Sequence, residues 1–431
     1  MTTPTNPHLA VDDPGAAAAA PCAGGIGRAG VHDPHPGART GSADPPWGGA
    51  LCRERPPKYG DRTPPPALHV DDPGELIAAI PAMLGFAPER SLVVLMLRPV
   101  PDPVDKSIIE AIMRFDLDTD GGPINGGAVV PHIAHLCAGL AAGKVLAVIV
   151  DDRLSEPPPR RGRARMRSAT KPFTGLITTL ALQLSDRGLV FGGVWAVPGF
   201  GAGLPWWSVS GLDRHGRVPD PATSMVAMAH LLDGRPIHAS RGELAALVAP
   251  DPVLAAEVAA QLDSAVAVAR DRYASAVRRG DPAGYSRTAI EQVLWQIANT
   301  ESGAELDAPE IAELIAALRD RPVRDAMFAL ALSEHALAAE GLWLALARAG
   351  SGSDRAEAAA LLGYSAYARG DGPFAGMALT AALAADPAHP MAVLLETALY
   401  MGLRPDRLRS LARCGFDTAG LLGIDLGLER P

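Results

Sequence analysis

Aromatic residues are scarce in this chain of 431 residues, of which they make up 5%. A core of such a chain has to be built mainly from alanine, leucine and valine. Cysteine is also scarce, with four residues in widely separated positions and no CxxC pair. This spacing excludes a disulfide framework and a zinc knuckle. We interpret them as free thiols in a reducing compartment, at Cys22, Cys52, Cys137 and Cys414.

Long hydrophobic runs and a basic charge balance are missing as well. No run approaches the roughly 18 apolar residues that a transmembrane helix requires. The N-terminus lacks a basic segment followed by an apolar core, so no secretory signal is indicated. We therefore predict a soluble, cytoplasmic protein. The net charge of −9 argues against a protein whose whole surface binds nucleic acid, because such a surface has to be basic.

Sequence signatures of the common catalytic sites are absent. The chain contains no HExxH, GxSxG, GxGxxG or Walker pattern. Ser240 lies three residues before Glu243, and this spacing in front of "LAALV" is typical of a capping box at a helix start. A serine hydrolase is therefore not indicated, and no cofactor is indicated either.

Composition and periodicity divide the chain into four segments. Residues 1–66 are rich in Pro, Gly, Ala and Arg without apolar periodicity, so they cannot offset their ordering entropy and are predicted to be disordered. Residues 67–250 alternate strands with helices, which predicts an α/β layered domain with a mixed sheet. A helical connector follows over 251–320, and residues 321–431 are predicted to form a tetratricopeptide-like helical region.

The first ordered stretch reads "DPGELIAAIPAMLGFAPERSLVVLML" from Asp72. An aspartate, a proline and Glu75 three residues on predict an N-capped helix with a capping box. The same spacing recurs at Asp307 with Glu310 and at Asp354 with Glu357. Apolar runs predict strands over 91–97, 113–117, 144–150 and 189–197, and periodicity predicts helices over 129–142 and 173–185.

Beyond residue 252 the pattern is helical, with amphipathic stretches over 254–278, 285–299 and 310–318. The phrase "AALLGYSAYARGDGPFAGMALTAALAADP" follows tetratricopeptide spacing. Leu362, Gly363, Ala375, Leu379 and Pro387 take the pattern's positions, whereas alanine stands where the pattern has Trp and Tyr. An ordinary helical bundle stays open as the alternative.

Several phrases resemble those of the actinobacterial family called domain of unknown function 4192. They include "LIAAIPAMLGFAPERSLVV", "KVLAVIVDD", "VPDPATSMVAMAHLLDGRPIHASRGEL", "YSRTAIEQVLWQIA" and "RAEAAALLGYSAYARGDG". They are spread over roughly residues 70 to 400, which is most of the predicted ordered chain. The resemblance implies a family and a host lineage. It carries over no catalytic residue, because no activity is associated with the family.

Asp151 and Asp152 are the first candidate site residues, because they directly follow the apolar strand "KVLAVIV". Ligands of open α/β sheets tend to bind at the carboxyl ends of the strands. Adjacent carboxylates there could hold a cation or act as acid and base. The alternative is a solvated strand end. Consecutive strand residues point to opposite faces, which disfavours a cation shared by both.

Trp206 and Trp207 follow the glycine-rich loop "PGFGAGLP" and are the second pair of ligand-binding candidates. They could stack on a ligand in a cleft, with loop amides approaching a phosphate. The alternative is that both indoles fasten the loop to the core.

Three further patterns are weaker. "DLDTDG" from Asp116 begins like a calcium loop, but glycine stands where a bidentate acid is needed. "HIAHLC" from His132 to Cys137 offers metal-ligand types, but a structural helix start is favoured and no metal site is predicted. The loop Arg160–Lys171 contains six basic residues and could contact phosphate groups. A codon-biased insertion is favoured for this loop.

Two functional interpretations remain open. The first is a noncatalytic ligand- or partner-binding scaffold, whose C-terminal helical region binds a protein partner. The second is a metal-assisted enzyme that acts on a phosphorylated or nucleotide-like small molecule. Convergence of Asp151, Asp152 and Asp116 around an open pocket with Trp206 would favour the enzyme. Divergence of these acids would favour the scaffold.

Overall fold

The fold is described by a computed structural model of the chain. It covers residues 72–99, 107–119, 122–123, 129–139, 143–156, 173–210, 214–232 and 235–426. The predicted disordered segment, residues 1–66, and the Arg160–Lys171 loop both lie outside the described residues.

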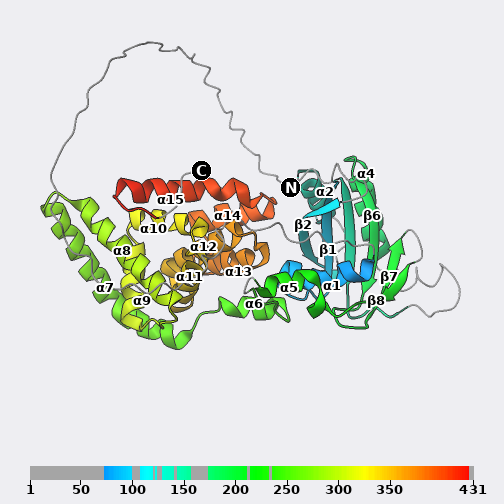
Figure 1. Cartoon of the computed structure of the whole chain (residues 1–431), viewed down its shortest axis with the longest axis horizontal. Coiled ribbons are helices and arrows are strands. Elements are labelled where there is room, and N and C mark those ends of the chain that lie inside the picture. The colour runs from blue at the N-terminus through cyan, green and yellow to red at the C-terminus, as the bar shows by residue number, and fades with distance from the viewer. Residues whose placement is uncertain are drawn as a thin grey trace, which may run out of the picture. The chain divides into compact units, whose positions relative to one another are not determined.

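A mixed six-stranded sheet forms the centre of the N-terminal part, as predicted (Figure 1). The strand order is β2-β1-β5-β6-β7-β8. Only β5 and β6 are paired in parallel, and every other neighbouring pair in this sheet is antiparallel. The strands are β1 (Ser91–Pro99), β2 (Ser107–Asp116), β5 (Lys144–Val150), β6 (Val190–Val197), β7 (Pro205–Ser210) and β8 (His215–Arg217).

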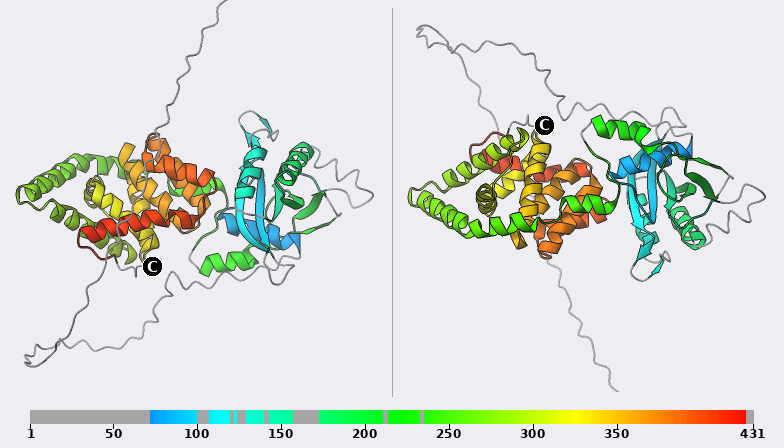
Figure 2. Two further views of the ribbon diagram at one scale, coloured as in Figure 1. Left: turned by 90° about the horizontal axis from the view of Figure 1, so that it is seen from above. Right: turned by 90° about the horizontal axis from the view of Figure 1, so that it is seen from below.

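Helices cover both faces of this sheet, which makes three layers (Figure 2). Helices α2 (Val129–Gly139) and α4 (Thr174–Ser185) lie on one face with alternate residues of β1 and β5. Helix α1 (Pro73–Leu84) lies on the other face. The first six residues of β1 are all buried, because apolar layers enclose the strand from both sides.

The start of α1 shows how local sequence determines local structure. Asp72 is the N-cap, its carboxylate accepts a hydrogen bond from Gly74 N at 3.1 Å, and Pro73 occupies the first turn. The carboxylate thus binds the second helical residue, so the capping box predicted with Glu75 does not form. Gly85 ends the helix with a φ of 73°, a conformation that glycine adopts without strain.

Most predicted elements of the α/β part are confirmed within one to three residues, and the differences have physical reasons. Strand β2 begins at Ser107, well before the predicted 113, because its half-buried residues give no continuous apolar run. Strands β7 and β8 and two helical segments, η2 (Pro221–Thr223) and α5 (Met225–Leu232), were not predicted. Helix α6 (Arg241–Leu247) begins after Ser240 as predicted, and the Ser240 hydroxyl accepts a hydrogen bond from Glu243 N at 3.1 Å. The small hairpin β3 (Asp118–Thr119) and β4 (Gly122–Pro123) was also missed.

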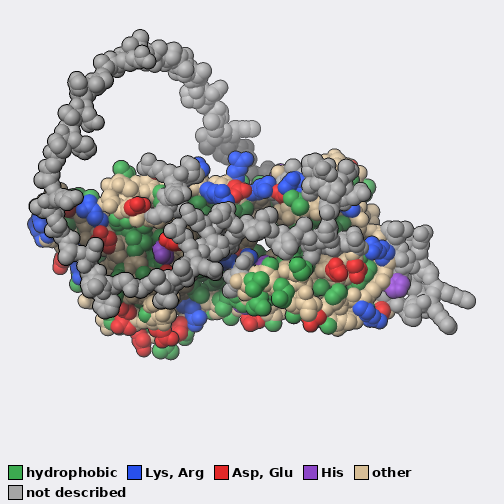
Figure 3. All heavy atoms as spheres, in the orientation of Figure 1, with side chains coloured by type: hydrophobic (Ala, Val, Ile, Leu, Met, Phe, Trp, Pro, Cys, Tyr) green, Lys and Arg blue, Asp and Glu red, His purple; other side chains and the backbone are tan. Residues whose placement is uncertain are grey.

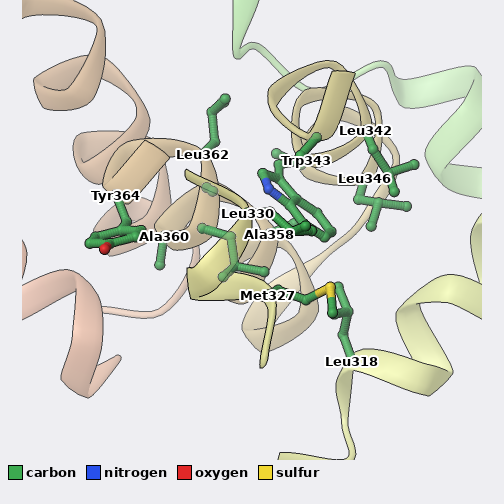
Figure 4. Packing of buried hydrophobic residues seen from close by; sticks show 14 of the residues in the cluster. Leu318, Met327, Leu330, Leu342, Trp343, Leu346, Ala358, Ala360, Leu362 and Tyr364 are labelled. Atoms are coloured by element: carbon green, nitrogen blue, oxygen red, sulfur yellow. The ribbon is translucent and has the colours of Figure 1, made fainter. Parts of the chain in front are cut away.

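Residues beyond Pro252 are helical, as predicted, and 63% of the structure is helix. The helices are α7 (Pro252–Arg278), α8 (Pro282–Glu301), α9 (Ala308–Leu318), α10 (Arg321–Met327), η3 (Phe328–Leu332), α11 (Ala336–Ala349), α12 (Gly352–Ala368), α13 (Gly372–Ala385), α14 (Pro390–Tyr400), η4 (Pro405–Leu408) and α15 (Arg409–Leu421). Their core is rich in alanine and leucine around a few large side chains. Figure 4 shows Trp343 within this core, beside Leu330 and Ala358.

The predicted capping boxes of this region had different outcomes. At α9, Asp307 and Glu310 form the box: Oδ1 of Asp307 accepts from Glu310 N at 2.9 Å, and Oε2 of Glu310 accepts from Asp307 N at 3.0 Å. At α12 the prediction is wrong. That helix begins after Ser351, and Asp354 binds Arg319 at 2.7 Å. The tertiary ion pair takes the carboxylate that the local pattern would have used.

Helices α12 and α13 pack closely through Gly363. A Cβ on this glycine would lie 2.8 Å from the side chain of Leu379, so glycine permits the approach. Gly363 and Leu379 both match the tetratricopeptide spacing, and the assignment to that repeat type stays a prediction. The domain boundaries at 66, 250 and 320 stay predictions as well.

One stretch, Arg241–Arg278, is long and apolar enough by length and composition to cross a membrane. It comprises two separate helices, α6 and α7, and the last turns of α7 carry Arg270, Asp271 and Arg272. Helix α7 also packs against α9 and α8. This single candidate is weak evidence for a membrane span.

Candidate functional site

The candidate aspartates lie at the end of the parallel strand pair, where the sheet edge was expected to bind ligands. Asp151 directly follows β5, and its backbone N–H donates to the carbonyl of Val197, the last residue of β6, at 3.1 Å. This hydrogen bond continues the strand pairing by one residue. The carboxyl ends of β5 and β6 therefore meet where the two aspartates stand.

Asp151 is buried, with 1% exposure, and its carboxylate is fully engaged by Arg153. Oδ1 accepts from the backbone N of Arg153 at 2.9 Å and from its Nε at 2.8 Å, while Oδ2 accepts from Nη2 at 2.7 Å. Burial raises the pKa of Asp151, but the hydrogen bonds and the positive charge of Arg153 lower this pKa by a larger amount. The resulting pKa is below the ordinary value of an aspartate. The carboxylate is thus held ionised in a closed turn.

Asp152 points elsewhere and binds a different arginine. Its side chain is 64% exposed, and its two oxygens accept from Arg90 Nε at 2.9 Å and Nη2 at 3.2 Å. These hydrogen bonds lower the pKa of Asp152. Arg90 has a φ of 41° and is the one described non-glycine residue with positive φ. The ion pair therefore fastens the turn that leads into β1.

Asp116 is the third acid that could converge with Asp151 and Asp152 on one site. Its carboxylate also binds an arginine. The two terminal guanidinium nitrogens of Arg114, Nη1 and Nη2, donate to its carboxylate. Arg114 Nε also donates to the hydroxyl of the buried Ser91 at 2.8 Å, and that hydroxyl donates to the carbonyl of Glu89. Arg114 thereby joins the end of β2 to the start of β1.

Each of the three aspartates therefore has its own arginine, and they do not converge on one point. Among the described residues, no group of three or more His, Cys, Asp or Glu side chains is placed to hold a metal ion. The arrangement can fix turns at the sheet edge through charge-assisted hydrogen bonds. It presents no set of unpaired carboxylates for a cation or for proton transfer.

Trp206 and Trp207 lie on β7, with their side chains on opposite faces of the sheet. Trp206 is 3% exposed and packs with α1, whereas Trp207 is 1% exposed and packs with α2 and α4. A Cβ on Gly74 or Gly216 would lie 2.8 Å from Nε1 of Trp206, so two glycines admit its indole. Their role as ligand-binding residues stays a prediction, while their position is that of core residues.

The glycine loop before them forms a tight connection. Gly203 has a φ of 79°, and its N–H donates to the carbonyl of Val218 at 2.9 Å. The N–H of Val218 donates in turn to the carbonyl of Leu204 at 2.8 Å. Glycine serves the turn conformation here, and these amides are used within the protein.

The "HIAHLC" segment lies on α2 and divides between its two faces. Cys137 is fully buried against the sheet, and burial raises the pKa of its thiol to about 12. His135 is exposed on the other face. The imidazole of His132 stacks on the ring of Tyr400, with 4.1 Å between the two ring centroids. Partial burial and the neighbouring His135 lower the pKa of His132. The three side chains do not form one ligand set.

The described part of the "DLDTDG" segment includes the last residue of β2, Asp116, and both residues of β3. Asp118 and Thr119 form β3 and pair with β4 in a short antiparallel hairpin. Asp120 lies outside the described residues.

The structure also reveals an apolar surface that sequence reasoning missed. On α5, Met225, Met228, Leu231 and Leu232 are 57%, 48%, 71% and 85% exposed, respectively. Figure 3 shows hydrophobic side chains gathered over this helix. The opposite face packs against α1, where Ala227 is buried. Apolar residues on both faces of "SMVAMAHLL" are the sequence signal that could have identified it.

A small cavity of about 50 Å³ lies between α7, α8 and α9. Its lining includes Ala265, Arg272, Tyr285 and Glu313. Gln292, also in the lining, donates to Glu313 at 2.9 Å. A space of this size accommodates little more than water molecules.

The chain was compared with known families, curated proteins and solved structures. The family described as a domain of unknown function, DUF4192, matches residues 73–406. The chain belongs to the DUF4192 family. No curated protein and no solved structure matches this DUF4192 protein. The match begins at the first residue of α1 and ends within η4, which confirms the extent of the resemblance seen in the sequence. The family description gives no activity, so it assigns no residue a role.

Proposed function

We propose that this DUF4192 protein is a noncatalytic binding protein that assembles with other proteins. The observation that carries the proposal is the apolar outer face of α5. Four large apolar side chains stand in solvent there, on a helix whose other face is already packed on α1. Exposed contiguous apolar surface of this kind marks interaction sites in soluble proteins.

The spacing on α5 favours a helical partner segment. Met225, Met228 and Leu232 are separated by three and four residues, which places them along one side of two helical turns. An amphipathic helix laid along this side would cover them with its own apolar stripe. Methionine adapts its shape to such a partner because its side chain is unbranched and flexible.

The C-terminal helical region, residues 321–431, provides a second contact surface in this proposal. It is supported by the apolar residues that α14 exposes. A tetratricopeptide-like pairing of α12 with α13, an actinobacterial host and a cytoplasmic location complete the proposal. The charge-paired aspartates support it too, because a scaffold needs them only to fix the sheet edge.

Capture of partners by the full chain tests the α5 surface. The immobilised protein is incubated with lysate of its source organism, and bound proteins are quantified by mass spectrometry. Met228→Glu and Leu231→Glu should each reduce capture of a specific protein by about tenfold or more, which corresponds to about 1.4 kcal/mol. The charge in each variant stands where the partner needs apolar contact.

The matched control is Leu182→Glu on α4, where leucine is 61% exposed outside the α5 surface. It should leave capture unchanged. Circular dichroism checks that all three variants fold. An identical set of captured proteins for the wild-type chain and both α5 variants would contradict the proposal.

A further inference from the structure

Helix α14 carries an apolar stripe that faces solvent. Val393, Leu394, Tyr400 and Met401 are 43%, 56%, 61% and 51% exposed. Tyr400 keeps this exposure although one face of its ring stacks on His132. The inner residues Ala392 and Leu395 are fully buried.

From outside, α2 reaches the stripe through the stack of His132 on Tyr400, and Val393, Leu394 and Met401 stay exposed. Helix α14 packs against α13 and α12 on its inner side. The next helix, α15, packs against α10 and η3 instead. A stack of helices that ends on an apolar face normally requires a polar cap for solubility. The stripe is spaced as one helix–helix interface, so the element that would cover it is another α-helix.

The order of residues along the stripe is symmetric about Thr397. Val393 and Leu394 precede it by four and three residues, and Tyr400 and Met401 follow it by three and four. We propose that the covering helix is α14 of a second copy of this chain, paired antiparallel about a two-fold axis through Thr397. Val393 then faces the second copy's methionine at position 401, and Leu394 faces its tyrosine at position 400. A two-fold interface requires such self-complementarity.

The antiparallel arrangement also opposes the two helix dipoles, whereas a parallel pairing would align them.

The pairing should be weak because the helix is short. Eleven helical residues and the C-cap Met401 together expose four apolar side chains, which cannot reach the roughly 800 Å² per partner of a standard interface. We expect a dissociation constant on the order of tens of micromolar. The inference rests on the proposed function only in assigning a binding surface to the helical region. It is tested with the purified chain alone, so its failure would leave the α5 proposal standing.

Analytical ultracentrifugation of the full chain over a range of about 1 to 200 µM tests the pairing, since this range brackets the expected constant. The weight-average mass should rise from 44.7 kDa towards twice that value. Leu394→Glu should keep it at the monomer mass throughout. The control is Leu337→Glu on α11, whose leucine is also 56% exposed, and it should associate as the wild type does.

A disulfide cross-link at the proposed two-fold axis tests the register of the two α14 helices. Thr397→Cys is compared with Thr380→Cys on α13, in a chain in which Cys22, Cys52 and Cys414 are serine. The two threonines are matched, since both are exposed and each hydroxyl donates to the carbonyl four residues earlier at 2.7 Å. Under mild oxidation Thr397→Cys should form disulfide-linked dimers faster, by on the order of tenfold, because pairing brings its thiols together.

Three results would overturn the proposal. They are a monomer mass across the whole concentration range, association that Leu394→Glu leaves intact, and equal cross-linking of the two cysteine variants. The first two would remove α14 as a self-pairing surface. The third would remove the antiparallel register.

Discussion

Two adjacent aspartates at the end of β5 have opposite environments. The backbone N–H of Asp151 still pairs with β6 and its side chain enters the protein, whereas Asp152 begins the turn and its side chain is exposed. Each then takes an arginine from its own side, Arg153 for the first and Arg90 for the second. At the residue scale, backbone geometry thus directs two carboxylates that are adjacent in the sequence to different surroundings.

Asp151, the buried aspartate of this pair, should make the stability of the fold depend on pH. The folded-state pKa of Asp151 is lowered, so its contribution is present above its unfolded pKa of about 3.9 and is lost as pH falls through the folded pKa. Asp151→Asn should therefore lower the free energy of unfolding by about 2 kcal/mol at pH 7, the range for a charged hydrogen bond. The difference in the free energy of unfolding between wild type and variant should become smaller below about pH 4.

Urea unfolding of both proteins at several pH values measures this gap. Asp152→Asn serves as the control and should lose less stability, because its carboxylate is largely exposed. A gap for Asp151→Asn that stayed the same from neutral to acid pH would show that the carboxylate titrates alike in both states.

At the scale of elements, a buried ion pair joins three helices. Arg369, at the end of α12, donates through Nε and Nη2 to Glu340 of α11 at 3.0 Å each. Its Nη1 donates to Asp371, the N-cap of α13, at 3.2 Å. The side chains of Arg369 and Glu340 are 8% and 9% exposed. Water therefore cannot replace either partner.

Arg369→Met should cost about 3–5 kcal/mol, because it leaves Glu340 buried without a counter-charge. The double variant Arg369→Met with Glu340→Leu should recover much of that loss, because no charge is left buried. Denaturant unfolding of the single and double variants measures both effects. If the double variant were as unstable as the single one, packing rather than charge would explain the loss.

Elements with strong local signals could be predicted from the sequence. Strand β5 matches its prediction because seven residues without a turn former are bounded by glycine and aspartate. Strands β7 and β8 were missed because Pro205 and Gly216 give the sequence of a loop, although the sheet recruits both segments by edge pairing. Arg90 and Asp152 are 62 residues apart, so no local pattern indicates their contact. The exposed face of α5 was missed because the helix itself was not predicted, and an apolar pattern does not say which face of a helix is covered.

At the scale of the whole molecule, the acids and the apolar surfaces favour different functions. The carboxylates of the sheet edge are each neutralised, while α5 and α14 expose apolar side chains on opposite halves of the family match. The net charge of −9 disfavours anionic small molecules and agrees with the proposed contacts with other proteins. Cation binding by one of these carboxylates would require its arginine to leave.

A thermal-shift screen with Mg²⁺, Ca²⁺, nucleotides and sugar phosphates should therefore leave the melting temperature of the full chain within about 1 °C. A ligand at a hundred times its dissociation constant would stabilise the fold by about 2.7 kcal/mol, a rise of several degrees in a domain of this size. Asp151→Ala and Asp152→Ala are screened beside the wild type. A cation-dependent rise in the wild type that disappears in either variant would support the metal-assisted enzyme, because only direct ligation makes the stabilisation depend on those carboxylates.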